Sequence, residues 1–84
     1  MGQNEKLAKL IAKAKQSPNN FAFSDLVHLW ELLGADFERQ RGSHKIYRHP
    51  LNPAIINIQD SNGKAKVYQV RQALQWIEDY SLIH

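Results

Sequence analysis

The residues best suited to chemistry lie in one central stretch of the chain, between positions 39 and 49. This stretch reads Arg-Gln-Arg-Gly-Ser-His-Lys-Ile-Tyr-Arg-His, so that four cations, two imidazoles and a phenol surround a tight Gly turn. Arg and Lys hold phosphate oxygens, Gly lets the backbone approach a ligand, and a neutral imidazole accepts a proton near pH 7. The mixture therefore indicates phosphate chemistry.

RNA fits such a stretch because it carries its own nucleophile, the 2′-hydroxyl. A His that removes the hydroxyl proton, beside a cation that neutralises the developing charge, can cleave the strand without a metal. A basic two-strand hairpin on a small domain is also a common solvated face or passive binding surface. From spacing alone, both interpretations stay open.

Helical periodicity predicts two elements before this stretch. A basic amphipathic helix is expected over residues 1–15, ended by the breakers at 17–20, and it should pack on the domain by its apolar stripe. A second helix is expected to begin at the N-cap Ser24 and to end at Gly34 in a left-handed cap. The apolar positions of the two helices are Leu7, Leu10, Ile11 and Ala14, then Leu26, Leu29, Trp30 and Leu33.

From residue 36 onward the pattern changes to period two. Strands are expected at 37–41, 44–49 and 54–59, with turns at 42–43 and 60–63, a loop at 50–53 and a final helix at about 68–80. This order predicts an α+β fold, in which the helices cover one face of a three-stranded antiparallel sheet. Along the second strand, His44 shares one face with Ile46 and Arg48, and Lys45 shares the other with Tyr47 and His49. If Ile46 is buried, His44 is accessible only at the start of its strand.

Composition narrows the function classes. The chain has 84 residues, a net charge of +3 and no Cys, which excludes disulfides, thiolate metal sites and Cys nucleophiles. It has no Gly-rich phosphate loop, no His-Glu-x-x-His and no Gly-x-Ser-x-Gly motif, so we expect no cofactor and no metal site. The charge suits a polyanion or an acidic protein that takes its place. No apolar run could span a membrane and no signal-peptide pattern begins the chain, so a cytoplasmic location is expected.

Two segments carry a resemblance to a known family. Gly42-Ser43-His44-Lys45-Ile46-Tyr47, preceded by a Leu-Leu-Gly helix end and a basic strand, resembles the signature of HicA-type toxins, the small mRNA interferases of bacterial toxin–antitoxin pairs. The runs Ile-Asn-Ile-Gln at 56–59 and Gly-Lys-Ala-Lys-Val-Tyr-Gln-Val-Arg-Gln at 63–72 resemble a longer subgroup with an extra N-terminal helix. We therefore expect a single domain over 1–84, with an N-terminal helix at 1–16 and a HicA-like core at 21–81.

The resemblance implies a fold, an activity and a partner. The fold is like a double-stranded-RNA-binding domain, α-β-β-β-α, and the activity is mRNA cleavage with His44 as the catalytic residue, which Gly42 presents. The partner is a HicB-like antitoxin that covers the active face. Compact members carry a second His after the third strand, which this chain lacks, so a partner for His44 would have to be His49, Lys45, Tyr47 or Arg48.

Contacts to the mRNA substrate are expected mainly from basic residues. Asn57 and Gln59 are further candidates for base or ribose contacts, or simply solvated strand residues. Two alternatives to the toxin remain, a non-catalytic RNA-binding domain of the same fold and a protein-interaction module for an acidic partner. The expected RNA-binding residues are Arg39, Arg41, Gly42, Ser43, Lys45, Arg48, Lys64 and Lys66.

Overall fold

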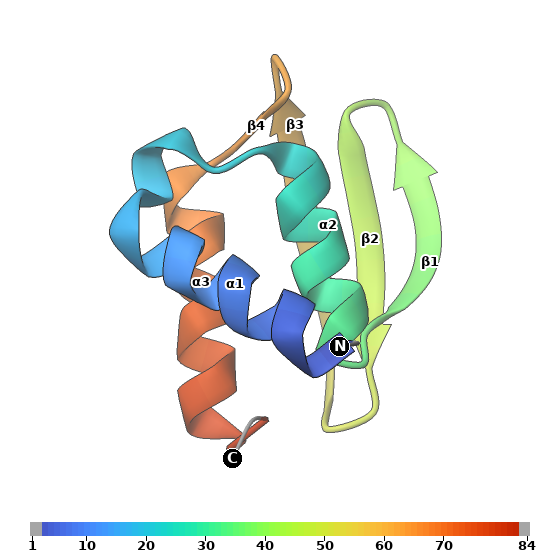
Figure 1. The fold of residues 1–84 in the computed structure, drawn as a ribbon. Helices are drawn as coiled ribbons and strands as arrows, with labels where there is room; N and C mark the ends of the chain where they lie inside the picture. The colour runs from blue at the N-terminus through green and yellow to red at the C-terminus, as the bar shows by residue number, and fades with distance from the viewer. Residues whose placement is uncertain (1–2, 83–84) are drawn as a thin grey trace.

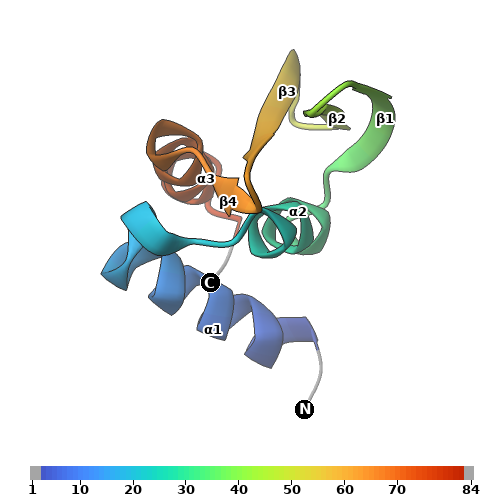
Figure 2. The ribbon, with the colours of Figure 1, turned by 90° about the horizontal axis from the view of Figure 1, so that it is seen from above.

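The computed structural model describes residues 3–82 and arranges them in three layers, which Figures 1 and 2 show from two directions. The sheet is the first layer, α2 and α3 lie against one of its faces, and α1 crosses these two helices on the side away from the sheet. The elements follow in the order α1 Gln3–Gln16, a 3-10 turn Pro18–Asn20, α2 Phe23–Leu32, β1 Asp36–Arg41, β2 His44–His49, β3 Asn52–Ser61, β4 Lys64–Ala65 and α3 Val67–Asp79.

The sheet is antiparallel, with the strand order β1-β2-β3-β4. This confirms the α+β class, the α-β-β-β-α order typical of a double-stranded-RNA-binding domain and the additional N-terminal helix. The sheet has one strand more than expected. β4 is only two residues long, too short to give a sequence pattern, and it pairs with the end of β3 and with Ala22 before α2.

The hydrophobic core lies between the sheet and the helices. β2 and β3 contribute Tyr47, Ile56 and Ile58, which are at most 1% exposed, and α2 and α3 meet them with a perpendicular pair of rings, Trp30 and Trp76, at 5.3 Å. α1 adds its apolar stripe, of which Leu7, Ile11 and Ala14 are buried and Leu10 is partly buried. The expected packing of α1 by this stripe is confirmed.

The expected N-terminal boundary of α2 is wrong. Ser24 is not the N-cap of α2, because the helix begins one residue earlier, after Ala22. The N–H of Phe23 donates to the carbonyl of Gly63 at 2.9 Å, so the β3–β4 turn satisfies the helix start that a Ser side chain was expected to satisfy. Gly34 does take the expected left-handed conformation, with φ of +98°.

The expected loop at 50–53 is shorter, because β3 begins at Asn52 and includes Pro53. A Pro is tolerated there because β4 pairs only with Asp60 and Ser61, which leaves the other edge of β3 open near its start. The ladder between β2 and β3 is also irregular at this point, between Tyr47 and His49.

A side-chain amide fastens α3 to the open edge of β3. Gln69, in the first turn of α3, is only 3% exposed. Its Nε2 donates to the carbonyl of Asn57 and its Oε1 accepts from the N–H of Gln59, both at 2.9 Å. The amide thus occupies the hydrogen-bonding positions that a neighbouring strand would fill.

Replacing this amide by an apolar group of similar size should destabilise the fold. Gln69→Leu leaves one carbonyl and one N–H of β3 without a partner, and each unpaired buried group costs about 1–3 kcal/mol. We expect the free energy of unfolding, measured by urea denaturation, to fall by about 2 kcal/mol or more. Gln72→Leu, on the exposed side of the same helix, is the control and should change it by less than about 0.5 kcal/mol. Equal stability of the two variants would contradict the role given to Gln69.

Candidate functional site

A shallow groove of about 300 Å³ lies on the face of the sheet that the helices leave open. It runs across the first three strands and has a cationic rim and an apolar floor. The chemistry-bearing stretch of the sequence supplies four of its six lining residues. These six are Arg39, Arg41, His44, Ile46, Ile55 and Asn57.

The register of the sheet places these residues on one face. Arg41 pairs with His44, Arg39 with Ile46, and Ile46 with Asn57, and residues that pair across antiparallel strands share a face. A bulge in β1 between Phe37 and Arg39 is essential to this arrangement. Without the extra residue, the register would shift by one and Arg39 and Arg41 would face the helices.

His44 begins β2 and is half-buried. Its Nδ1 lies 2.9 Å from Oδ1 of Asn57 on the neighbouring strand. Ile46, two residues further along β2, is only 4% exposed but does not belong to the core cluster, because it faces the groove. Ile46 is therefore covered by neighbouring side chains on the open face and not by the core. Its burial does not imply that His44, on the same face, is buried as well.

The two Arg residues of the rim differ in their partners. Arg39 Nη1 and Arg48 Nε both donate to the carboxylate of Glu38, each at 2.8 Å, and Arg48 also donates to the carbonyl of Pro53 at 3.0 Å. Arg48 is thus tied to the far end of β2 and does not line the groove. No ion pair of Arg41 occurs within the described residues, so its charge is available to a ligand.

His49 is a structural residue and not a partner for His44. It is 6% exposed on the helix side of the sheet and its ring lies 5.3 Å from that of Trp76. Its Nδ1 accepts from the N–H of Leu51 at 3.1 Å, so Nε2 carries the proton and donates to the carbonyl of Leu33 at 2.8 Å. Both ring nitrogens are therefore occupied within the fold.

Two other candidates for a partner also lie on the helix side of the sheet. Tyr47 is 1% exposed and belongs to the core, and Lys45 pairs with the buried Ile58. Burial raises the pKa of Tyr47 from its ordinary value of 10.0, and the negative charge of Glu31 acts in the same direction. Neither residue shares the groove with His44.

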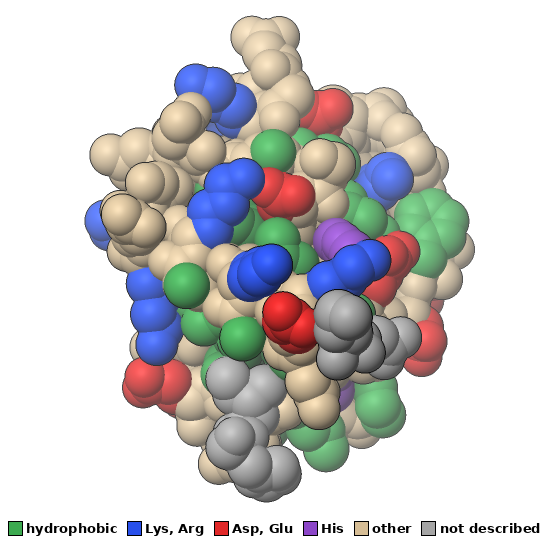
Figure 3. All heavy atoms as spheres, in the orientation of Figure 1, with side chains coloured by type: hydrophobic (Ala, Val, Ile, Leu, Met, Phe, Trp, Pro, Cys, Tyr) green, Lys and Arg blue, Asp and Glu red, His purple; other side chains and the backbone are tan. Residues whose placement is uncertain are grey.

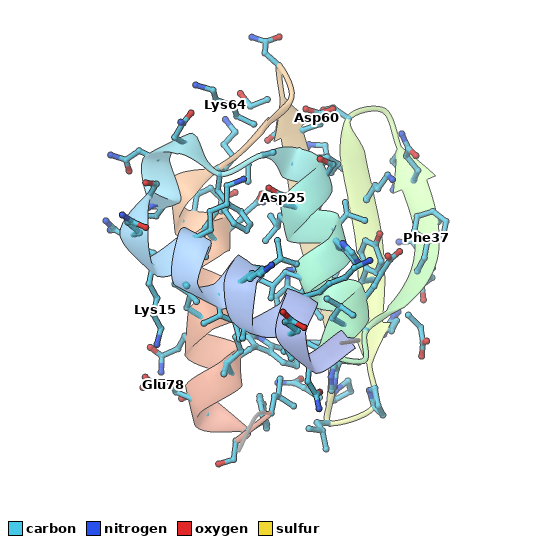
Figure 4. The ribbon with its side chains drawn as sticks, viewed as in Figure 1. Lys15, Asp25, Phe37, Asp60, Lys64 and Glu78 are labelled. Atoms are coloured by element: carbon cyan, nitrogen blue, oxygen red, sulfur yellow. The ribbon has the colours of Figure 1, made fainter. Side chains whose placement is uncertain are left out.

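The remaining expected RNA-binding residues surround the groove or lie away from it. Gly42, at φ of +59°, and Ser43 form the turn next to His44, and the carbonyl of Ser43 accepts from the N–H of Asp60 at 2.9 Å. Lys64 lies on β4, across the molecule from Phe37 on β1 (Figure 4), and Lys66 directly precedes α3. The structure does not bring these two Lys side chains into the groove.

The helix side of the molecule is not a uniform basic surface. Its Lys and Arg side chains are interspersed with Asp and Glu (Figure 3), and Lys13 of α1 is paired with Asp25 of α2 at 2.8 Å. Within residues 3–82, no group of three or more His, Asp or Glu could hold a metal ion. No helix in this part of the chain is long and apolar enough to cross a membrane.

Sequence reasoning missed two features of the site. The sequence pattern predicts only that Ile55 lies in a strand, whereas the structure shows it 44% exposed and lining the groove. Asn57 was considered as an RNA contact, but its side chain reaches His44. The pairing of β2 with β3 would have predicted that contact. Gln59 lies directly opposite His44, and Asn57, two residues away on β3, lies on the same face of the sheet.

These features define a small α+β domain in which a groove on the open face of the sheet is lined by one imidazole and two guanidinium groups. A comparison with protein-family models agrees with this class: the model described as "HicA toxin of bacterial toxin-antitoxin" matches residues 23–78. The match covers more than half of the chain, so the chain belongs to the HicA toxin family, whose members are generally ribonucleases. It spans α2 to α3 and leaves α1 outside. No curated protein and no solved structure matches the chain.

The placement of Tyr47 in the core predicts a pH dependence of stability. A raised pKa means that the folded state keeps a proton that the unfolded state loses, so stability is fully present below pH 10 and falls as the pH rises above it. We expect the free energy of unfolding of the wild type to fall between pH 8 and pH 10.5 by more than that of Tyr47→Phe, as measured by urea denaturation. Parallel pH curves for the two proteins would contradict this placement.

Proposed function

We propose that this protein is the ribonuclease toxin of a toxin–antitoxin pair and cleaves mRNA in the cytoplasm with His44 as its catalytic residue. The observation that carries the proposal is the groove itself. Among its six lining residues, His44 carries the one imidazole, a group that can both accept and donate a proton, and it lies beside two guanidinium groups. The family of the chain supports the same activity.

The proposed reaction is an attack of the RNA on itself. Nε2 of His44 takes the proton of a 2′-hydroxyl, the 2′-oxygen attacks the adjacent phosphorus, and the bond from phosphorus to the 5′-oxygen breaks. The products are a 2′,3′-cyclic phosphate and a 5′-hydroxyl, whose proton comes from water, because His49 and Tyr47 are buried elsewhere. Arg39 and Arg41 stabilise the negative charge on the phosphate oxygens.

We assign the RNA contacts by whether each residue lies at the groove that contains His44 or away from it. Arg39, Arg41 and the turn at Gly42 and Ser43 bind the phosphates next to the cleaved bond. Arg48 binds RNA only when a phosphate replaces the carboxylate of Glu38. Lys45, Lys64 and Lys66 lie outside the groove and contact only flanking nucleotides.

The same surface suits an antitoxin. An acidic HicB-like protein would pair with the cations of the rim and bury the apolar side chain of Ile55. Binding there would exclude RNA by occupying the groove.

Loss of the imidazole should remove toxicity and leave the fold intact. We expect wild-type protein, induced in a bacterial host, to arrest growth and to generate new mRNA ends detectable by primer extension. His44→Ala should do neither, although it accumulates as soluble protein, because general base catalysis contributes about 10²–10⁴-fold. His28→Ala, which changes an imidazole on α2 outside the groove, is the matched control and should remain toxic.

Two results would contradict the assignment. Equal harmlessness of wild type and His44→Ala would favour the non-catalytic RNA-binding domain or the protein-interaction module. Cleavage that survives in His44→Ala would place the catalytic group elsewhere.

The role of Arg41 in binding is tested separately from cleavage. In a His44→Ala background, Arg41→Gln should weaken binding to a short RNA and reduce the slope of log affinity against log salt by about 1, because one fewer phosphate is neutralised. Lys6→Gln makes the same change of charge on α1, in the layer farthest from the sheet, and should leave the slope unchanged. Equal slopes for both variants would contradict the proposed RNA path.

A further inference from the structure

The contact between His44 and Asn57 bears on which of the two ring nitrogens of His44 carries the proton. The atom of Asn57 that faces Nδ1 is the carbonyl oxygen Oδ1, at 2.9 Å, and a carbonyl oxygen can only accept a hydrogen bond. With Oδ1 facing the ring, this contact is a hydrogen bond only when Nδ1 carries a proton. A neutral imidazole has one N–H, so Nε2 then has a free lone pair. Among the described residues, none hydrogen-bonds to Nε2 of His44.

We propose that Asn57 is the positioning residue of the site, holding His44 in the tautomer that is protonated at Nδ1 so that Nε2 is free to accept a proton from the substrate. The role for Nε2 rests on the proposed ribonuclease function, whereas the tautomer itself does not. Asn57 would touch no reacting atom, and its effect on cleavage would pass through the imidazole. This differs from the RNA contact that the sequence alone suggested.

The backbone on both sides of Asn57 is held in place by the core and by α3. Ile56 and Ile58 are both 0% exposed in the core. The carbonyl of Asn57 accepts from Nε2 of Gln69, and the N–H of Gln59 donates to Oε1 of the same amide. The core and α3 thus fix the backbone from which the side chain of Asn57 reaches His44.

His49 provides an internal comparison on the same strand. Its Nδ1 accepts a hydrogen bond from the N–H of Leu51, so the proton is on Nε2. The fold therefore imposes opposite tautomers on two His residues five positions apart. In His49 both nitrogens are used by the protein, and in His44 one is left for a ligand.

The test is a measurement of the tautomers in the RNA-free protein. Long-range ¹H–¹⁵N correlation spectra of ¹⁵N-His-labelled protein, recorded above the titration of the imidazoles, distinguish a protonated ring nitrogen from one with a lone pair. We expect protonation at Nδ1 for His44 and at Nε2 for His49. A His44 protonated mainly at Nε2 would overturn the proposal, whether or not the protein cleaves RNA.

Three variants identify the cause. Asn57→Leu should shift His44 toward a mixture of tautomers, whereas Asn57→Asp keeps an acceptor and should keep the tautomer. Gln59→Leu changes an amide directly opposite His44 and should also keep it, because the structure gives the Gln59 side chain no hydrogen bond to the ring. An unchanged His44 spectrum in folded Asn57→Leu would overturn the proposal.

Cleavage kinetics then separate positioning from RNA contact. Asn57→Leu should lower kcat by about 10–100-fold with little change in KM, as expected when a His loses the hydrogen bond that orients it. Asn57→Asp should retain activity but require a higher pH, because its carboxylate stabilises the imidazolium form. A rise in KM with unchanged kcat for Asn57→Leu would show that Asn57 binds RNA and does not position His44.

Discussion

The amide of Gln69 holds together the two parts of the structure on which the site depends. Two of its hydrogen bonds join the first turn of α3 to the edge of β3, where no strand continues the sheet. Asn57 is one of the two β3 residues that this amide binds. Its side chain contacts His44 on the face of the sheet that the helices leave open. The helix layer is therefore linked to the imidazole through one buried amide, that of Gln69, and one exposed amide, that of Asn57. Buried amides of this kind are costly unless both ends are paired, and here both are.

The two faces of the sheet have different roles: one packs against the helices and forms the core, and the other carries the candidate site. On the helix side, β2 contributes Tyr47 to the core and His49 to a network in which both ring nitrogens are satisfied. On the open side, the same strand presents His44, and the bulge in β1 turns Arg39 and Arg41 toward it. Strand alternation alone would not have produced this arrangement. The bulge changes the register by one residue, which is enough to move two cations from the core side to the groove.

The sequence predicted much of this, because the informative patterns are local. The helical stripes, the Gly42–Ser43 turn and the bounds of β2 all follow from neighbouring residues, and the structure agrees. The missed features depend on distant contacts. Gly63 satisfies the start of α2 in place of Ser24, and β4 exists through pairing with β3 and Ala22. Lys64 and Lys66 stay predicted RNA contacts, but only the three-dimensional arrangement shows that they do not line the groove of His44. The one contact that assigns a role to Asn57 also requires the register of two strands.

The central claim is that the imidazole of His44 activates the 2′-hydroxyl of RNA. The most direct measurement uses purified protein and a short RNA, with analysis of the termini produced in the presence of a metal chelator. The account predicts a 2′,3′-cyclic phosphate and a 5′-hydroxyl, with or without the chelator, and no cleavage when the nucleotide before the cleaved bond is replaced by its 2′-deoxy form. Cleavage of the deoxy-substituted strand, or products with a 5′-phosphate, would show that the RNA does not supply the nucleophile and would contradict the account.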